Sequence, residues 1–122
     1  MDPKTVIADY MAAWNEPDEA KRKLLIERCW AEDGLYCDPV SDGRGRDALN
    51  SFIAGMHAQQ PGARIDLASG IDQHHNQVRF AWRFITADGK TAIEGIDAGE
   101  LAPDGKIARI VGFWGAPPAK GS

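Results

Sequence analysis

The chain has 122 residues, of which 43% are hydrophobic and 26% are charged, and its formal net charge at pH 7 is -4. This length fits a single domain, residues 1–122, with one hydrophobic core. The scattered, slightly acidic charge argues against a nucleic-acid surface. The N-terminus has no signal-peptide pattern, and no apolar stretch is long enough to cross a membrane. We therefore expect a cytoplasmic protein without nucleic-acid or membrane partners.

Three helices are predicted in the first half of the chain. Apolar residues recur at helical spacing over 5–14, and Pro17 ends this helix because proline disfavours helical geometry in the residue before it. A second helix is predicted over 17–30, with the Asp-Gly pair at 33–34 as its stop signal. The third covers 48–56.

The string LYCDPV, residues 35–40, separates the second and third predicted helices. It is too short for a helix and is bounded by turn-forming residues, so it predicts a short strand that ends in a proline turn. The next string, SDGRGRD at 41–47, has the composition of a loop. Asp38 is then either a turn former at the strand end or a base at the mouth of a pocket.

After residue 62 the hydrophobic pattern changes from helical to alternating spacing. Asp-Gly pairs at 88–89 and 104–105 are typical of hairpin turns. The pattern predicts four strands, at 65–71, 78–84, 93–101 and 107–114. We therefore predict an α+β fold in which three N-terminal helices cover the concave face of a strongly curved antiparallel sheet.

The sequence contains no familiar motif for nucleotide binding, serine nucleophiles or metal chemistry. Cys29 and Cys37 are too few for a disulfide framework or a zinc site. His57 lacks partners at metal-ligand spacing, and His74 and His75 fall in a polar turn. We expect neither a metal nor an organic cofactor.

Asp97 lies in an unusual position, because alternation places it on the inner face of a strand between Ile93 and Leu101. A carboxyl group removed from water has a raised pKa, and in its protonated form it donates a hydrogen bond. Asp97 could equally accept hydrogen bonds from a buried backbone or from an arginine. The candidate arginines are Arg79, Arg83 and Arg109.

Five strings, spread over nearly the whole chain, carry a resemblance to a known superfamily. They are DYMAAWN at 9–15, WAEDGLYCDPV at 30–40, GRDAL at 45–49, EGIDAGEL at 94–101 and GKIARIVGFWG at 105–115. Together they resemble the superfamily that includes nuclear transport factor 2 (NTF2), the SnoaL-like polyketide cyclases and the ketosteroid isomerases. The resemblance implies an NTF2-like cone with an apolar cavity near Asp38. It also implies a homodimer formed through the outer sheet face, where Ile96, Ala98 and Ala108 are expected.

The resemblance to ketosteroid isomerases implies a role for each of three residues. Asp38, in its Asp-Pro-Val string, would move a proton beside a carbonyl group, while Tyr10 and Asp97 would hydrogen-bond the enolate oxygen. In a polyketide cyclase, Asp38 or Asp97 would instead promote an intramolecular aldol closure. The candidate walls around a steroid-like or polyketide-like ligand are Trp14, Phe52, Trp82 and Trp114. Phe80 and Phe84 are assigned to the core.

The chain also departs from the isomerase pattern. Tyr10 and Asp38 are about one helical turn further apart in sequence, and Ile53 stands where those enzymes carry a second tyrosine.

One alternative is a non-catalytic ligand-binding or dimerisation module of the same fold. Another is an epoxide hydrolase, which would need an arginine between two aspartates in the cavity, for which Arg83 and Arg109 are the candidates.

Overall fold

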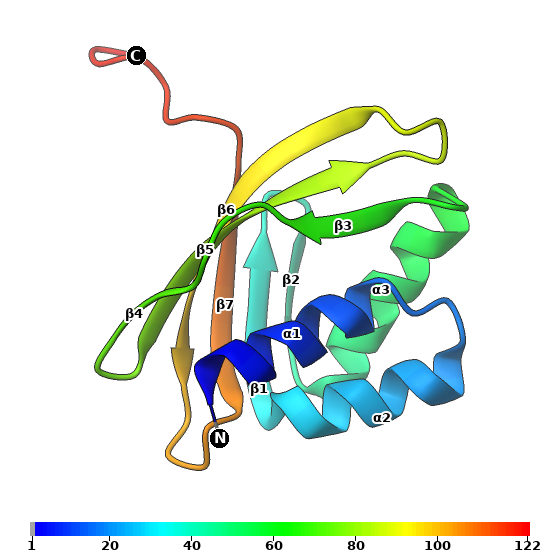
Figure 1. Cartoon of the computed structure of the whole chain (residues 1–122), viewed down its shortest axis with the longest axis vertical. Helices are drawn as coiled ribbons and strands as arrows, with labels where there is room; N and C mark the ends of the chain where they lie inside the picture. Colours follow the sequence, from blue (N-terminus) through cyan, green and yellow to red (C-terminus); the bar gives the residue numbers. More distant parts are fainter. Residues whose placement is uncertain (1) are drawn as a thin grey trace.

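Three helices pack against the concave face of a curved sheet in the computed structural model, which describes residues 2–122 (Figure 1). The helices are α1 (Pro3–Trp14), α2 (Glu19–Cys29) and α3 (Arg46–Gln59). The strands are β1 (Trp30–Asp38), β2 (Ser41–Arg44), β3 (Arg64–Leu67), β4 (Asp72–His74), β5 (Gln77–Ile85), β6 (Thr91–Leu101) and β7 (Ile107–Trp114). The three predicted helices and the α+β class are confirmed. No helix among the described residues combines the length and apolar character needed to span a bilayer.

The first two helices begin at aspartate caps. The Asp2 side chain accepts a hydrogen bond from the Lys4 amide, and Asp18 accepts one from the Lys21 amide. Each cap satisfies an amide group that has no partner within its helix. These local signals explain why the starts of α1 and α2 lie within two residues of their predicted positions.

The second helix ends at Cys29, so the prediction that it includes Trp30 is wrong. Trp30 begins β1 and pairs with Ile107 in β7. The Asp-Gly pair at 33–34, predicted to stop the helix, lies in an irregular part of β1 instead. A side chain at Gly34 would come within 2.5 Å of the Trp30 indole, so glycine allows this ring to lie against the strand. Long-range pairing has overridden the local helical spacing.

The segment SDGRGRD is not the predicted loop. Residues 41–44 form β2, which pairs with β1 in an antiparallel hairpin, and α3 begins at Arg46. The hairpin also separates α2 from α3, so the helices do not precede all the strands. A glycine-rich composition favours a loop, but β1 supplies a strand edge on which these residues form backbone hydrogen bonds.

The sheet has seven strands in the order β2-β1-β7-β6-β5-β3, and β4 also pairs with β5. The β1–β7 pair is parallel and the remaining pairs are antiparallel, so the sheet is mixed and larger than the predicted four-stranded meander. Of the predicted strand at 65–71, only the part up to Leu67 forms a strand, β3, and β4 begins at Asp72, so the prediction that His74 lies in a polar turn is wrong. The hairpin turns at 88–89 and 104–105 are confirmed, with positive φ angles at Gly89 and Gly105.

Two long-range contacts hold the end of α1 against the rest of the fold. Asn15 donates to the Ile65 carbonyl and accepts from the Ile65 amide, both at 2.7 Å, and thus binds the free edge of β3. The His57 ring lies 2.8 Å from the Trp14 carbonyl and links α3 to the same turn. These contacts fix the position of Trp14 over the concave face of the sheet.

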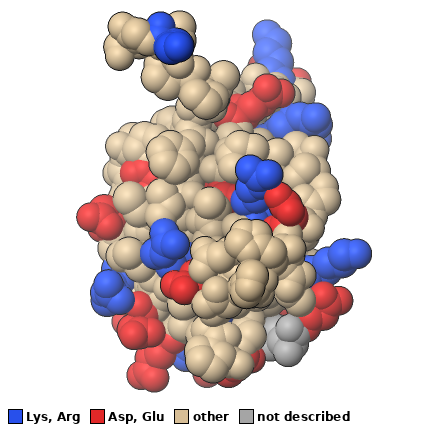
Figure 2. Space-filling view, turned by 90° about the vertical axis from the view of Figure 1, so that its left-hand side faces the viewer, with Lys and Arg blue, Asp and Glu red and all other residues tan. Residues whose placement is uncertain are grey.

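Charges of both signs are interspersed over the face at the left of Figure 1, as Figure 2 shows. Of the four ion pairs among the described residues, three join two elements and one lies within β3. Exposed pairs of this kind contribute little to stability. The fold therefore depends on the apolar core between the helices and the sheet.

Candidate functional site

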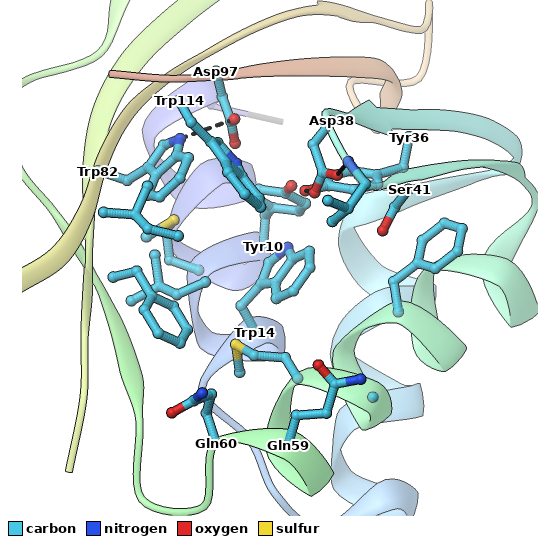
Figure 3. A pocket seen from close by; sticks show the side chains of 18 of the residues that line it. Tyr10, Trp14, Tyr36, Asp38, Ser41, Gln59, Gln60, Trp82, Asp97 and Trp114 are labelled. Carbon is cyan, nitrogen blue, oxygen red and sulfur yellow. Dashed lines mark hydrogen bonds between the residues drawn. The ribbon is translucent and has the colours of Figure 1, made fainter. Parts of the chain in front are cut away.

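A pocket of about 600 Å³ opens between the helices and the concave face of the sheet. Figure 3 shows Asp38 and Asp97 toward one end of the pocket and Gln59 and Gln60 toward the other. The aromatic residues in its lining are Tyr10, Trp14, Tyr36, Phe52, Trp82, Phe84 and Trp114. The size and the mainly apolar walls are typical of a small-molecule site.

Asp38 is both a turn former and a pocket residue. One of its carboxylate oxygens accepts a hydrogen bond from the Val40 amide at 2.9 Å, which stabilises the turn between β1 and β2. The other oxygen accepts from the Tyr36 hydroxyl at 2.6 Å. The same side chain lines the pocket, so the two alternatives left open by the sequence are compatible.

Tyr36 was not predicted as a site residue. It lies two residues before Asp38 on β1, and residues with this spacing share one face of a strand. Burial raises the pKa of the Tyr36 hydroxyl far above its ordinary value, and the hydrogen bond to Asp38 and the Asp38 charge add to this effect. Tyr36 is thus a neutral donor. The alternation within LYCDPV was a signal that could have identified it.

Asp97 is buried, with 5% of its surface exposed, and it faces the same pocket as Asp38. The Trp82 indole donates to its carboxyl group at 2.9 Å. Desolvation raises the pKa of Asp97 to about 7; the Trp82 hydrogen bond opposes this shift, while the nearby charge of Asp38 adds to it. At neutral pH a large fraction of Asp97 is therefore protonated and able to donate a hydrogen bond.

The arginines considered as partners of Asp97 lie elsewhere. Arg79 pairs with Asp72, and Arg83 lies 3.6 Å from Glu94 on the outer face of the sheet. No arginine is among the described residues that line the pocket. The aspartate–arginine–aspartate set needed by an epoxide hydrolase is thus not found there.

Gly112 occupies the space between the two carboxyl groups. It lies on β7, the strand between β1 and β6, and pairs with Asp97. A side-chain carbon at this position would lie 2.8 Å from an Asp97 oxygen and 3.5 Å from the Asp38 β-carbon. The absence of a side chain therefore allows both acids to face one pocket.

Tyr10 projects from α1 into the same region. Its ring stacks on Trp30 at a centroid distance of 5.7 Å, and only 1% of its surface is exposed. Burial raises the pKa of its hydroxyl well above the usual value; the Asp97 charge adds to this, and the Trp14 indole opposes it. Within residues 2–122, no group accepts a hydrogen bond from the Tyr10 hydroxyl. Every side-chain nitrogen or oxygen in this range that is fully shielded from solvent has a hydrogen-bond partner. The Tyr10 hydroxyl is therefore open to the pocket.

The four predicted wall residues, Trp14, Phe52, Trp82 and Trp114, all line the pocket. Trp114 lies at its rim with 38% of its surface exposed. Phe80 is in the core as predicted, whereas Phe84 is partly buried, packs against the core and also lines the pocket. Phe84 pairs with Ile93, which lines the pocket too.

Further polar lining residues were missed by sequence reasoning. They are Ser41, Ser51, Gln59 and Gln60, which come from β2, α3 and the end of that helix. No local motif distinguishes them from ordinary surface residues. In the part of the chain that the structure describes, no three His, Cys, Asp or Glu side chains gather into a group that could hold a metal ion.

Comparison with known proteins places this geometry in a family. A family model described as the SnoaL-like domain matches residues 7–110. A structure from Agrobacterium tumefaciens, named as a provisional isomerase of the SnoaL-like family, is 38% identical, with a TM-score of 0.86 over 92% of this chain and 96% of that chain. A search of curated proteins finds no match.

Two more distant structures show the fold alone. A Methylobium petroleophilum protein with a cystatin-like fold is 21% identical, with a TM-score of 0.77 over 98% of this chain and 80% of that chain. A Catenulispora acidiphila protein with a ketosteroid isomerase-like fold, solved with trimethylamine, is 13% identical, with a TM-score of 0.71 over 88% and 83%. Because the SnoaL-like model covers most of the sequence and the fold agrees with it, this chain belongs to the SnoaL-like family of NTF2-like proteins.

Proposed function

We propose that this protein catalyses acid–base chemistry at a carbonyl group of a mainly apolar, steroid-like or polyketide-like molecule, through an enolate. The observation that carries the proposal is that Asp38, Asp97 and Tyr10 line one pocket, in which burial raises the pKa values of Asp97 and Tyr10. Catalysis of this type needs one ionised carboxylate and neutral donors for the developing charge. The relative that is 38% identical, named as a provisional isomerase, supports the reaction class.

In the proposed reaction Asp38 removes a proton from the carbon beside the carbonyl group. The electron pair of the broken C–H bond forms the enolate, whose oxygen accepts hydrogen bonds from Tyr10 and protonated Asp97. In an isomerase, Asp38 then returns the proton to a different carbon. In a cyclase, the enolate carbon attacks a second carbonyl of the same molecule, and the new alkoxide takes the proton from Asp38.

A second candidate is a pocket that binds its ligand without turnover. The observation that favours it is the environment of Asp38, because both carboxylate oxygens already accept a hydrogen bond, from Tyr36 and Val40. Each of these bonds occupies a lone pair on an oxygen that would otherwise be free to take a proton from a ligand. The test below distinguishes binding from proton transfer.

The test measures deuterium exchange beside the carbonyl of a model ketone, β-tetralone, by NMR, together with quenching of tryptophan fluorescence by 2-naphthol. We expect Asp38→Asn to lower the catalysed exchange by about 100-fold or more while 2-naphthol still binds. Tyr10→Phe and Asp97→Asn are expected to weaken 2-naphthol binding. Asp42→Asn is the matched control, because it makes the same substitution at an exposed position of the same hairpin and should leave exchange unchanged.

Two results would contradict the proposed reaction. If 2-naphthol binds the wild-type protein but exchange stays at the background rate, the pocket is a carrier site. If exchange is catalysed equally by Asp38→Asn, another group is the base. Exchange that depends on Asp38 supports enolisation even before the natural substrate is known.

We also propose a homodimer formed through the outer face of the sheet. Ile96 and Phe113 pair across β6 and β7 on this face and are 43% and 64% exposed. Exposed apolar neighbours of this kind favour association. Sedimentation velocity should give a dimer that Phe113→Asp converts to a monomer, and a monomeric wild-type protein would contradict the proposal.

A further inference from the structure

The pocket contains two acids and no positive charge. Asp38 and Asp97 are the only Asp, Glu, Lys, Arg or His side chains among the described residues that line it. We propose that the pocket selects its ligands by charge: it binds neutral and ammonium-bearing molecules and excludes molecules that carry a carboxylate or a phosphate. This inference rests on the proposed function and narrows its substrate class.

Three arginines elsewhere in the fold have partners outside the pocket. Arg79 and Arg83 pair with acids on the outer face. Arg22 is buried between the helices, where it donates to Asn50 and to the Glu16 carbonyl. None of these groups is available to neutralise a ligand anion. In a site with low-dielectric walls an unmatched charge has a strong effect, because little water screens it.

The polar groups in the pocket wall also indicate what a ligand offers. The Tyr10 hydroxyl is nearly fully buried, opens to the pocket and has no recorded acceptor within residues 2–122. A neutral carbonyl or hydroxyl oxygen can accept its proton without adding charge. The indole rings of Trp14, Trp82 and Trp114 provide aromatic surfaces, which attract ammonium groups. Both features are compatible with a neutral or cationic ligand.

The charge of the pocket stays constant during the proposed reaction. Before proton transfer the negative charge is on Asp38, and after it the charge is on the enolate oxygen. While Asp97 is protonated, the pocket therefore holds one negative charge throughout when the substrate is neutral. A carboxylate on the substrate would add a second charge at every stage, with no cation beside it. An ammonium group would instead offset the first charge at every stage.

The selection is expected to depend on pH through Asp97. The groups that face it are Asp38 and Tyr36 from β1, Tyr10 from α1 and Trp82 from β5, with Gly112 from β7 beside it. Both tyrosines have raised pKa values and stay neutral. As the pH rises through about 7, Asp97 ionises and the pocket becomes more negative. The preference for cations should grow over this range.

The experiment compares three naphthalene probes of similar size by tryptophan fluorescence and calorimetry. They are 2-naphthalenemethanol, 2-naphthylmethylammonium and 2-naphthoate, which are neutral, cationic and anionic. At about pH 8 we expect the cation to bind about tenfold more tightly than the alcohol, and the alcohol about tenfold more tightly than the anion. Asp38→Asn should reduce the ratio between cation and anion by about tenfold.

Asp42→Asn is the matched control, because it makes the same change in net charge. Asp42 is exposed and pairs with Cys37, on the face of the hairpin opposite Asp38. We expect this variant to keep the full ratio. Since each probe is measured against the same folded variant, a general loss of affinity would not change the ratio.

Equal affinities for the three probes, tighter binding of 2-naphthoate or no binding of any probe would overturn the inference. An equal effect of Asp42→Asn and Asp38→Asn would do the same, because the surface charge would then explain it. If the pocket prefers the cationic probe but does not catalyse deuterium exchange at β-tetralone, this inference is supported and catalysis is contradicted. If the protein catalyses deuterium exchange but binds the three probes equally, enolisation is supported and charge selection is contradicted.

Discussion

Arg22 and Asp97 are both buried ionisable residues, with 2% and 5% of their surfaces exposed, but their surroundings differ. Arg22 donates to Asn50 at 2.7 Å and to the Glu16 carbonyl at 2.9 Å, and Asn50 donates in turn to Glu19. Asp97 has one donor, Trp82, and faces an open pocket. The first arrangement holds elements of the fold together, whereas the second leaves hydrogen-bonding capacity for a ligand.

The comparison shows that burial of a charged residue does not by itself indicate function. A buried group whose hydrogen bonds all lie within the protein stabilises the packing around it. A buried carboxyl group that lines a cavity and keeps a raised pKa costs stability, and such groups are frequent in active sites. Variants of Arg22 should therefore mainly change stability, whereas variants of Asp97 should change ligand binding.

The largest effect on stability is expected for Arg22→Met. The variant keeps an apolar stem but removes the guanidinium group, so Asn50 and the Glu16 carbonyl lose a buried partner. We expect a loss of about 3 to 4 kcal/mol in the free energy of unfolding, measured by urea denaturation. Arg28→Met is the control, because the Arg28 side chain is 63% exposed in its pair with Asp9 and should contribute no more than about 1 kcal/mol. If both variants lost the same free energy of unfolding, the buried Arg22 would contribute no more to stability than an exposed arginine.

Asp97→Asn should have the opposite effect on stability at high pH. The pKa of Asp97 in the folded protein is about 7, and in the unfolded chain it is about 4. The stability gained from holding the proton is thus present at low pH and is lost as the pH rises toward 7. The variant should exceed the wild type by roughly 3 kcal/mol at about pH 8 and by little at about pH 4.

Urea denaturation at the two pH values checks this expectation. Asp104→Asn is the control, because Asp104 is exposed in the hairpin between β6 and β7. An Asp97→Asn variant that is less stable than the wild type at about pH 8 would mean that its carboxylate is structural, as Arg22 is. The same variant should bind 2-naphthol more weakly, so that stability and binding change in opposite directions.

Gly112→Ala should have smaller effects on both stability and ligand binding. The new methyl group would approach an Asp97 oxygen to 2.8 Å, so the carboxyl group must move. We expect a loss of about 1 to 2 kcal/mol in stability and about a tenfold loss in 2-naphthol affinity. In Gly70→Ala, where a side chain meets no atom within 4 Å, both should be nearly unchanged. Unchanged 2-naphthol affinity in Gly112→Ala would show that Asp97 does not need its present position.

The parts of the site that could be predicted depend on the alternation of inward-facing and outward-facing residues along single strands. The pattern around Asp97 indicated its inward direction, and the structure places it there with 5% exposure. The same reasoning applied to LYCDPV would have identified Tyr36 beside Asp38. Neither pattern could indicate that Trp82 is the donor to Asp97, because that contact depends on the register between β5 and β6. Sequence reasoning had instead considered arginines.

The sequence by itself determined three helices, the strands β5, β6 and β7, and the two Asp-Gly hairpins, because these depend on periodicity and turn chemistry within short segments. Only the tertiary structure decided that residues 41–44 form a strand and that β1 pairs in parallel with β7. That pairing brings Asp38 and Asp97 to the two sides of Gly112. It joins residues more than half the chain apart, and no local propensity encodes such a contact, since its free energy comes from the assembled sheet and core.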